Sequence, residues 1–180
     1  MNIDFIIPLH ELATQIHQFN VDKGWWDEYL EDKTKRFDTS MMLVISELLE
    51  AMEGCRKDAM DDKLPEYPMF DVELADAAIR LLDLAGAYEI ENRIRKLQFK
   101  SRNSYFRRST KPEQLFSAVQ MMLRGLDISG KVYSGLIAVH CIADIHNIDL
   151  RAMIQAKMEY NDTRADHLRE NRAKKGGKKF

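Results

Sequence analysis

Apolar residues recur along this chain at the spacing of one face of an α-helix. Leu9, Leu12, Ile16 and Phe19 form such a stripe near the N-terminus, because side chains three and four residues apart share a helix face. The sequence has no alternating run of β-branched residues and no Asn-Gly or Asp-Gly hairpin turn, so it predicts no strand. The pattern predicts six helices, at residues 8–19, 38–57, 71–99, 110–124, 132–146 and 150–165.

Several predicted helix ends carry residues that suit a helix terminus. Residues 38–40, Asp-Thr-Ser, offer N-cap candidates, because their side chains can accept hydrogen bonds from free backbone N–H groups. Thr110-Lys-Pro-Glu113 has the spacing of a capping box. Asn147 suits a helix stop, and Asp149 suits the cap of the last helix.

The composition changes this picture little. The chain has 180 residues, 45% of them apolar and 31% charged, with a net charge of −2, as expected for one globular domain with a sizeable core. We expect one all-α helical bundle of about five to six helices over residues 1–170, and a basic, mobile tail over 171–180. No segment approaches the roughly 20 apolar residues of a membrane span, and the two cysteines read as free thiols of a cytoplasmic protein.

Two pairs of carboxylates lie within otherwise apolar helical sequence. They are Glu47-Leu-Leu-Glu50 and Glu73-Leu-Ala-Asp76, and the spacing of three places both members of a pair on one helix face. Ionised carboxylates in apolar surroundings are costly unless a cation compensates them. Four carboxylates on two helices would supply the oxygen ligands that Mg²⁺ prefers.

Polar residues of the last predicted helix form a second group. Lys157, Asn161 and Arg164 follow each other at spacings of four and three, so they share a face next to the apolar stripe. A lysine, an amide and a guanidinium together suit phosphate recognition. Trp25 and Trp26 lie in a predicted loop, where an aromatic ring can cap the core or stack on a base.

Two other interpretations compete with a metal site. Residues 93–111 contain eight Lys or Arg and no acid, so the chain could be a non-catalytic helical protein that binds nucleic acid through this stretch. The acidic residues of 58–73 and the near-neutral net charge weigh against it. Alternatively, the four acids could form salt bridges with Arg80 or Lys96 in a purely structural bundle.

These elements together resemble the MazG-like family of all-α nucleoside triphosphate pyrophosphohydrolases. The family signature is Glu-x-x-Glu, a spacer and Glu-x-x-Asp, which both acidic pairs match. Lys157-Met-Glu-Tyr-Asn161-Asp-Thr-Arg164 is similar to the family's last helix, and Gly24-Trp-Trp-Asp27 to its early loop. His167 and the closing Gly176-Gly-Lys-Lys-Phe180 are similar to the tail of many members. The stretch 93–125 is longer than in compact members.

The resemblance implies hydrolysis of a nucleoside triphosphate to the monophosphate and pyrophosphate. Glu47, Glu50, Glu73 and Asp76 would bind Mg²⁺, with Mn²⁺ as a substitute, and Glu50 with Glu47 would carry the catalysis. Glu50 in particular would orient or deprotonate the attacking water. Lys157 and Arg164 would neutralise the leaving group, Asn161 would bind a phosphate or the sugar, and Trp25 or Trp26 would contact the base. The resemblance also implies a homodimer or homotetramer and leaves the base open.

Overall fold

The described part of the chain is entirely helical apart from turns and loops. The computed structural model describes residues 3–4, 6–29, 31–95, 106, 109–172, 174 and 176. These residues form eight α-helices and three short 3₁₀-helices, and they form no strand. The expected all-α fold is therefore confirmed.

Six long helices carry the fold and correspond to the six predicted ones. They are α1 (Leu9–Asp22), α2 (Phe37–Lys57), α3 (Met69–Ala87), α6 (Lys111–Arg124), α7 (Ile128–Ile145) and α8 (Leu150–Thr163). The remaining elements have three or four residues each: η1 (Asp27–Tyr29), η2 (Lys33–Arg36), α4 (Glu91–Ile94), η3 (Ala165–His167) and α9 (Arg169–Arg172).

The prediction of one continuous helix over 71–99 was wrong. Helix α3 ends at Ala87, and Glu89 adopts a left-handed conformation with φ of 54°. The N–H group of Ile90 then donates to the carbonyl oxygen of Ala85 at 3.1 Å, a pattern that closes helix C-termini. The chain therefore turns before the short helix α4, and residues 96–99 of the prediction lie outside the described residues.

The caps of the later helices were predicted correctly, whereas that of α2 was not. A carboxylate oxygen of Glu113 accepts from the backbone N–H of Thr110 at 2.8 Å, and Asp149 accepts from that of Ala152 at 3.1 Å. Asn147 has φ of 55° just after α7. Helix α2, however, begins at Phe37 because η2, capped by Asp32, leads directly into it. Residues 38–40 therefore lie within its first turn.

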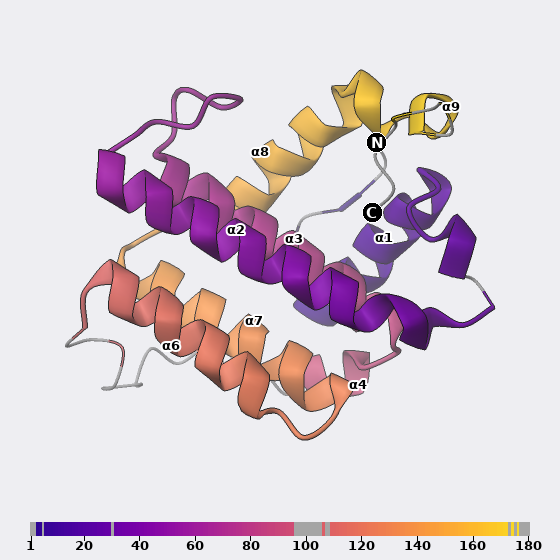
Figure 1. Cartoon of the computed structure of the whole chain (residues 1–180), viewed down its shortest axis with the longest axis horizontal. Coiled ribbons are helices and arrows are strands. Elements are labelled where there is room, and N and C mark those ends of the chain that lie inside the picture. The colour runs from indigo at the N-terminus through magenta and orange to yellow at the C-terminus, as the bar shows by residue number, and fades with distance from the viewer. Residues whose placement is uncertain are drawn as a thin grey trace.

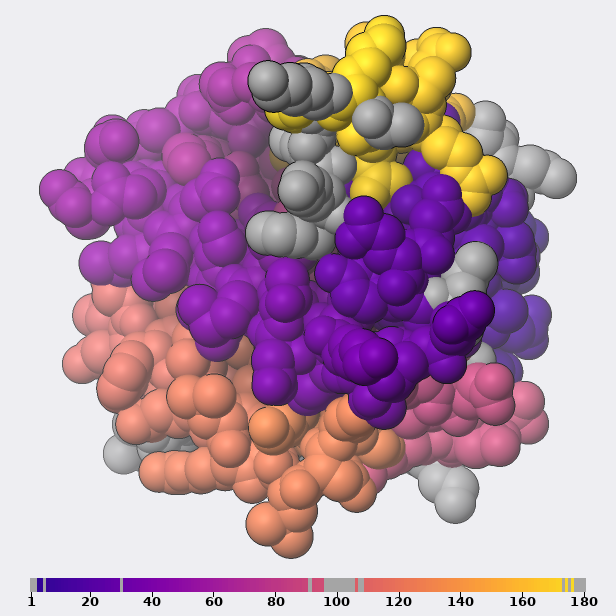
Figure 2. Space-filling view, turned by 45° about the vertical axis from the view of Figure 1, so that its right-hand side comes forward, coloured from indigo at the N-terminus to yellow at the C-terminus, as the bar shows by residue number. Residues whose placement is uncertain are grey.

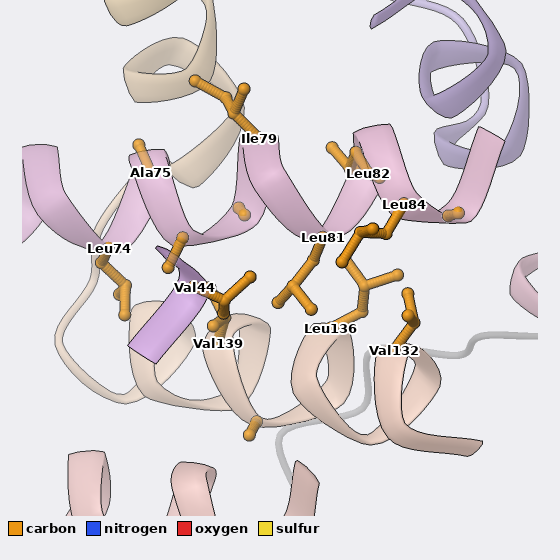
Figure 3. Close-up of a cluster of buried hydrophobic side chains, with 14 of the residues drawn as sticks. Val44, Leu74, Ala75, Ile79, Leu81, Leu82, Leu84, Val132, Leu136 and Val139 are labelled. Atoms are coloured by element: carbon orange, nitrogen blue, oxygen red, sulfur yellow. The ribbon is translucent and has the colours of Figure 1, made fainter. Parts of the chain in front are cut away.

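Helices α2 and α3 run side by side through the middle of the molecule, with α1 and α8 on one side and α6 and α7 on the other (Figure 1). Helix α3 is buried along nearly its whole length, since it packs against α1, α2, α7 and α8. On its α7 side, Leu81 and Leu84 face Leu136 and Val132 (Figure 3). Helices α2 and α3 turn polar side chains toward α1 and α8, and the candidate site lies on this side of the two helices.

Helices α1 and α3 cross closely at Gly86. A Cβ atom on Gly86 of α3 would lie 2.6 Å from the carbonyl oxygen of Ala13 in α1, so only glycine permits this close crossing.

Helix α7 is long and apolar enough to cross a membrane by length and composition alone, and half of it is buried inside the molecule. Core helices of soluble proteins share that profile, so this feature is weak evidence for a membrane span.

Candidate active site

A cavity of about 450 Å³ opens between α1, α2, α3 and α8. Its walls combine carboxylates, guanidinium groups, amides and apolar side chains. On the molecular surface, η3 and α9 lie against the loop after α1 (Figure 2), where Arg169 pairs with Asp27, and His167 of η3 lines the cavity. The lining residues are Phe19, Asn20, Trp25, Arg36, Leu43, Ser46, Glu47, Glu50, Asp76, Ile79, Arg80, Asp83, Met158, Asn161 and His167.

Three of the four predicted carboxylates come together, and two of them, Glu47 and Asp76, line this cavity. Glu47 of α2 and Glu73 and Asp76 of α3 can each place one oxygen within 4.8 Å of the others. The spacing of three in α3 and the side-by-side course of α2 bring them together. Glu47 and Glu73 are only 6% and 5% exposed, so this negative charge is held largely away from bulk water.

Two cations lie against the three carboxylates. The Nε atom of Arg80 donates to Glu47 at 2.6 Å, and the ammonium of Lys157 lies 2.8 Å from Asp76. Lys157 is itself buried, at 5% exposure. Because two cations face three carboxylates, the group keeps an excess of negative charge if all are ionised.

Burial and charge crowding raise the pKa values of Glu73 and Asp76. Burial raises the pKa of Glu73 to about 9, and the Asp76 carboxylate adds to the rise while Lys157 opposes it. Burial also raises the pKa of Asp76 to about 6, again against the effect of Lys157. A bound cation would reverse this, because it favours the ionised form of each ligand.

Glu50 differs from the other three acids in position. It lines the cavity but is exposed, and it does not belong to the close group of three. The Ser46 hydroxyl donates to it at 3.5 Å. Burial and the nearby Glu47 raise the pKa of Glu50 above its ordinary value, so its carboxylate is a stronger base than a fully solvated one.

The predicted phosphate-binding residues of α8 separate into two positions. Lys157 lies against Asp76, and Asn161 lines the cavity with its side-chain oxygen buried and without a hydrogen-bond partner among the described residues. Arg164 is not among the lining residues. Its guanidinium instead pairs with Asp166 through two hydrogen bonds of 3.0 and 2.7 Å. Of the three residues, only Asn161 therefore lines the cavity, whereas Lys157 lies beside it against Asp76.

The two tryptophans also separate. Trp25 lines the cavity, with the His167 ring edge-on at 5.2 Å and the guanidinium of Arg172 over its ring at 3.5 Å. Trp26 is completely buried, and its indole N–H donates to both oxygens of Asp83 at 3.1 and 3.2 Å. Of the pair, Trp25 is placed to touch a molecule in the cavity, whereas Trp26 supports the wall from behind.

Sequence reasoning missed two charged cavity residues, Arg36 and Asp83, and it named Arg80 only as a salt-bridge partner of the acids in the structural interpretation. Arg80 follows Asp76 by four residues in α3, so the helical spacing could have placed it on the acidic face. Asp83 continues that face after a further three residues, within an apolar run. Arg36 carries no such signal, because its place depends on how η2 packs onto the core.

Parts of two sequence predictions lie outside the described residues. Of the basic stretch 93–111, the structure describes residues 93–95, 106 and 109–111. Lys96 and most of the tail 171–180 are likewise not described. Nucleic-acid binding through these segments therefore stays a prediction.

The donor set of the acidic group fits a hard divalent cation. Three carboxylate oxygens within reach of one point, two of them from buried residues, match the oxygen ligation of Mg²⁺. Comparisons of the chain with protein-family models, with curated proteins and with solved structures found no match. The likeness to the MazG-like family therefore rests on the motif residues, and function has to be argued from the geometry of this cavity.

Proposed function

We propose that this protein is a Mg²⁺-dependent nucleoside triphosphate pyrophosphohydrolase that releases a nucleoside monophosphate and pyrophosphate. One observation carries the proposal. The carboxyl groups of Glu47, Glu73 and Asp76 lie together, two of them on the wall of an open cavity, with the ammonium of Lys157 beside them. A purely structural cluster has no need of such an opening, which gives a substrate access to the carboxylates.

The three converging acids would hold the metal ion. Mg²⁺ there would offset the charge of the phosphate oxygens and of the transition state. Glu47 and Asp76 line the cavity directly, and Glu73 lies beside them in the interior. Arg80 and Lys157, which pair with Glu47 and Asp76, fix the orientation of these two carboxylates.

Glu50 is best suited to activate the water. It lies on the cavity wall next to the acidic group, is accessible, and has a raised pKa. Its carboxylate would take a proton from water as the water oxygen bonds to the α-phosphorus. The bond from that phosphorus to the bridging oxygen then breaks, and its electron pair leaves with pyrophosphate. Lys157, and Arg164 if it exchanges Asp166 for substrate, would neutralise the leaving group.

The rest of the cavity would hold the nucleoside. Asn161 has an unsatisfied buried side-chain oxygen, so a sugar hydroxyl that donates to it would remove a cost that buried polar groups normally avoid. Trp25 would contact the base through the part of its ring that Arg172 and His167 leave open.

We also propose that the chain works as a homodimer or homotetramer in the cytoplasm. Met42 and Leu49 of α2 and Phe116 and Leu123 of α6 are each more than 59% exposed. These pairs lie seven residues apart, so each forms an apolar stripe along one helix. Gel filtration with light scattering should show an oligomer, and a strict monomer would contradict this part of the proposal.

Two ion pairs support the structural interpretation. Arg80 pairs with Glu47, as a salt-bridged bundle requires, and Lys157 pairs with Asp76. This interpretation predicts that Mg²⁺ leaves the melting temperature unchanged. A ligand of the native state would raise that temperature.

The first test is pyrophosphate release from a panel of ribo- and deoxynucleoside triphosphates, with Mg²⁺ and with EDTA. Wild type should release pyrophosphate only with the metal, and Glu50→Gln should not. Glu53→Gln is the matched control, because Glu53 lies on the same helix but pairs with Arg56 and Lys57 outside the cavity. No release from any triphosphate would contradict the proposed reaction.

A further inference from the structure

Arg36 is a buried guanidinium with no assigned role in the proposed reaction. It ends η2 immediately before α2, is only 4% exposed, and lines the cavity. Arginine is rarely this buried without a paired charge. Among the described residues, no carboxylate forms an ion pair with Arg36, so its burial calls for another explanation.

The contacts of Arg36 hold the side chain but leave part of it unsatisfied. Its Nε atom donates to the Ser40 hydroxyl at 3.3 Å, and its guanidinium stacks over Trp26 at 4.3 Å and Tyr29 at 5.4 Å. The Nη1 atom is buried and has no hydrogen-bond partner within the part of the chain that the structure describes. Burial lowers the pKa of Arg36, and the charge of Asp83 opposes that shift.

Asp83 does not complete these interactions. Its carboxylate accepts from the indole N–H of Trp26 at 3.1 and 3.2 Å and contacts Nδ1 of His17 at 2.8 Å. Both oxygens are therefore already engaged by other groups. The carboxylate of Asp83 therefore places negative charge near Arg36, but it accepts no hydrogen bond from the Nη1 atom of Arg36.

Arg36 and the acidic group mark two ends of the cavity. Asp83, beside Arg36, follows Asp76 by seven residues in α3, which is about 10 Å along a helix axis. A nucleotide whose α-phosphate lies at the acidic end can therefore place its base toward Arg36. The apolar side chains of Phe19, Leu43 and Ile79 line the cavity as well, as a base requires.

We propose that Arg36 is a specificity-determining residue, which donates a hydrogen bond to a carbonyl oxygen on the base of the substrate. This inference rests on the proposed function, since it takes the acidic end as the phosphate end. A guanidinium offers donors and no acceptor, so at the position it contacts it favours a carbonyl oxygen over an exocyclic amino group, which is itself a donor. When a donor is held in place and only the correct base accepts its hydrogen bond, the site discriminates strongly between bases.

The test uses nucleotide pairs that differ by a carbonyl or an amino group at one position. Binding of inosine against adenosine monophosphate, and of uridine against cytidine monophosphate, is measured by calorimetry for wild type, Arg36→Met and Arg36→Lys. Arg56→Met is the matched control, because Arg56 also lies on the α2 side but pairs with Glu53 at the surface. Wild type and the control should prefer the carbonyl member of a pair.

Arg36→Met should bind that preferred nucleotide on the order of 10- to 100-fold more weakly and lose the preference, given the usual worth of an arginine–base contact. Arg36→Lys keeps the charge and should recover part of the affinity. Melting curves with and without Mg²⁺ check that each variant is folded, and the Lys variant carries the test if the Met variant is not.

Three outcomes would overturn the inference: no carbonyl preference in wild type, an unchanged preference in Arg36→Met, or equal losses for all nucleotides together with weaker binding of free pyrophosphate. The last would place a phosphate at Arg36. Monophosphate binding needs no turnover, so base-selective binding without pyrophosphate release would contradict the proposed reaction and leave the role of Arg36 standing. Pyrophosphate release without base-selective binding would contradict only the proposed role of Arg36.

Discussion

The two ends of the cavity are unsatisfied in opposite senses. At the acidic end, Glu47, Glu73 and Asp76 face only two cations, and in the metal-free protein burial holds the pKa of Glu73 at about 9, so Glu73 keeps its proton near neutral pH. At the other end, Arg36 is buried with a donor that has no partner, while Asp83 is fully engaged by Trp26 and His17. One end therefore lacks a cation for its third carboxyl group, and the other lacks an acceptor.

This difference indicates how one elongated ligand could satisfy both ends. A metal–phosphate group supplies the missing charge, and a base carbonyl supplies the missing acceptor. Buried groups without partners carry a cost, which a structural protein has no reason to retain.

Glu47→Gln and Asp76→Asn should each abolish metal binding at the acidic end of the cavity and leave the Arg36 end intact. Loss of a metal ligand removes several kcal/mol of transition-state stabilisation, so pyrophosphate release should fall at least about 100-fold. Both variants should stay folded, because removing one negative charge relieves crowding in the metal-free protein. The measurements are pyrophosphate release and the rise in melting temperature with Mg²⁺, which both variants should lose. Unfolding of both would favour the structural interpretation.

Lys157→Ala should weaken the reaction without removing the metal. The ammonium lies 2.8 Å from Asp76 and would neutralise the leaving pyrophosphate, so its loss should lower the rate by about 10- to 100-fold, the scale of one charge-stabilising contact. Stabilisation by Mg²⁺ should persist. Steady-state kinetics and melting curves measure both, and unchanged kinetic constants would rule out a phosphate role for Lys157.

Gly86→Ala should disturb the Arg36 end of the cavity and leave the acidic end intact. A Cβ atom there meets the Ala13 carbonyl oxygen and the Cβ of His17, each at 2.6 Å, and overpacking of this kind costs about 1–3 kcal/mol. Moving α1 also displaces His17 from Asp83, so nucleotide binding should weaken. Chemical denaturation and monophosphate binding test this, and the Mg²⁺-induced rise in melting temperature should be preserved. Loss of that rise would mean that the two ends are not separable.

The acidic end should also show a characteristic pH dependence. The pKa of Glu73 rises from 4.5 to about 9 in the folded metal-free protein. Between these values the folded state keeps a proton that the unfolded chain releases, so the free energy of unfolding should fall as pH rises. Mg²⁺ binding requires the ionised carboxylate, so stabilisation by Mg²⁺ should grow over the same range. Denaturation curves with Mg²⁺ and with EDTA measure both trends, and Glu73→Gln should flatten them.

Much of the acidic end could be predicted from sequence, and little of the other end. Glu73 and Asp76 share a helix face by their spacing alone, and so do Lys157 and Asn161. That Glu50 stands apart from the other three could not be seen, because Glu47 and Glu50 share the same spacing. The separation of Trp25 from Trp26 also depends on the loop after Gly24, whose φ is 78°. The false continuation of α3 to 99 has a similar cause, since a left-handed Glu89 leaves no mark in the hydrophobic pattern.

The sequence by itself determined the six long helices, most of their caps and the residue types at the acidic end, because these depend on local periodicity and short-range hydrogen bonds. Only the tertiary structure decided that Glu47 meets Glu73 and Asp76, that Arg80 and Lys157 lie against them, and that Arg36 reaches the same cavity. The physical reason is that these contacts join residues far apart in the chain. Their geometry follows from how α1, α3 and α8 pack, as at the close crossing that Gly86 permits.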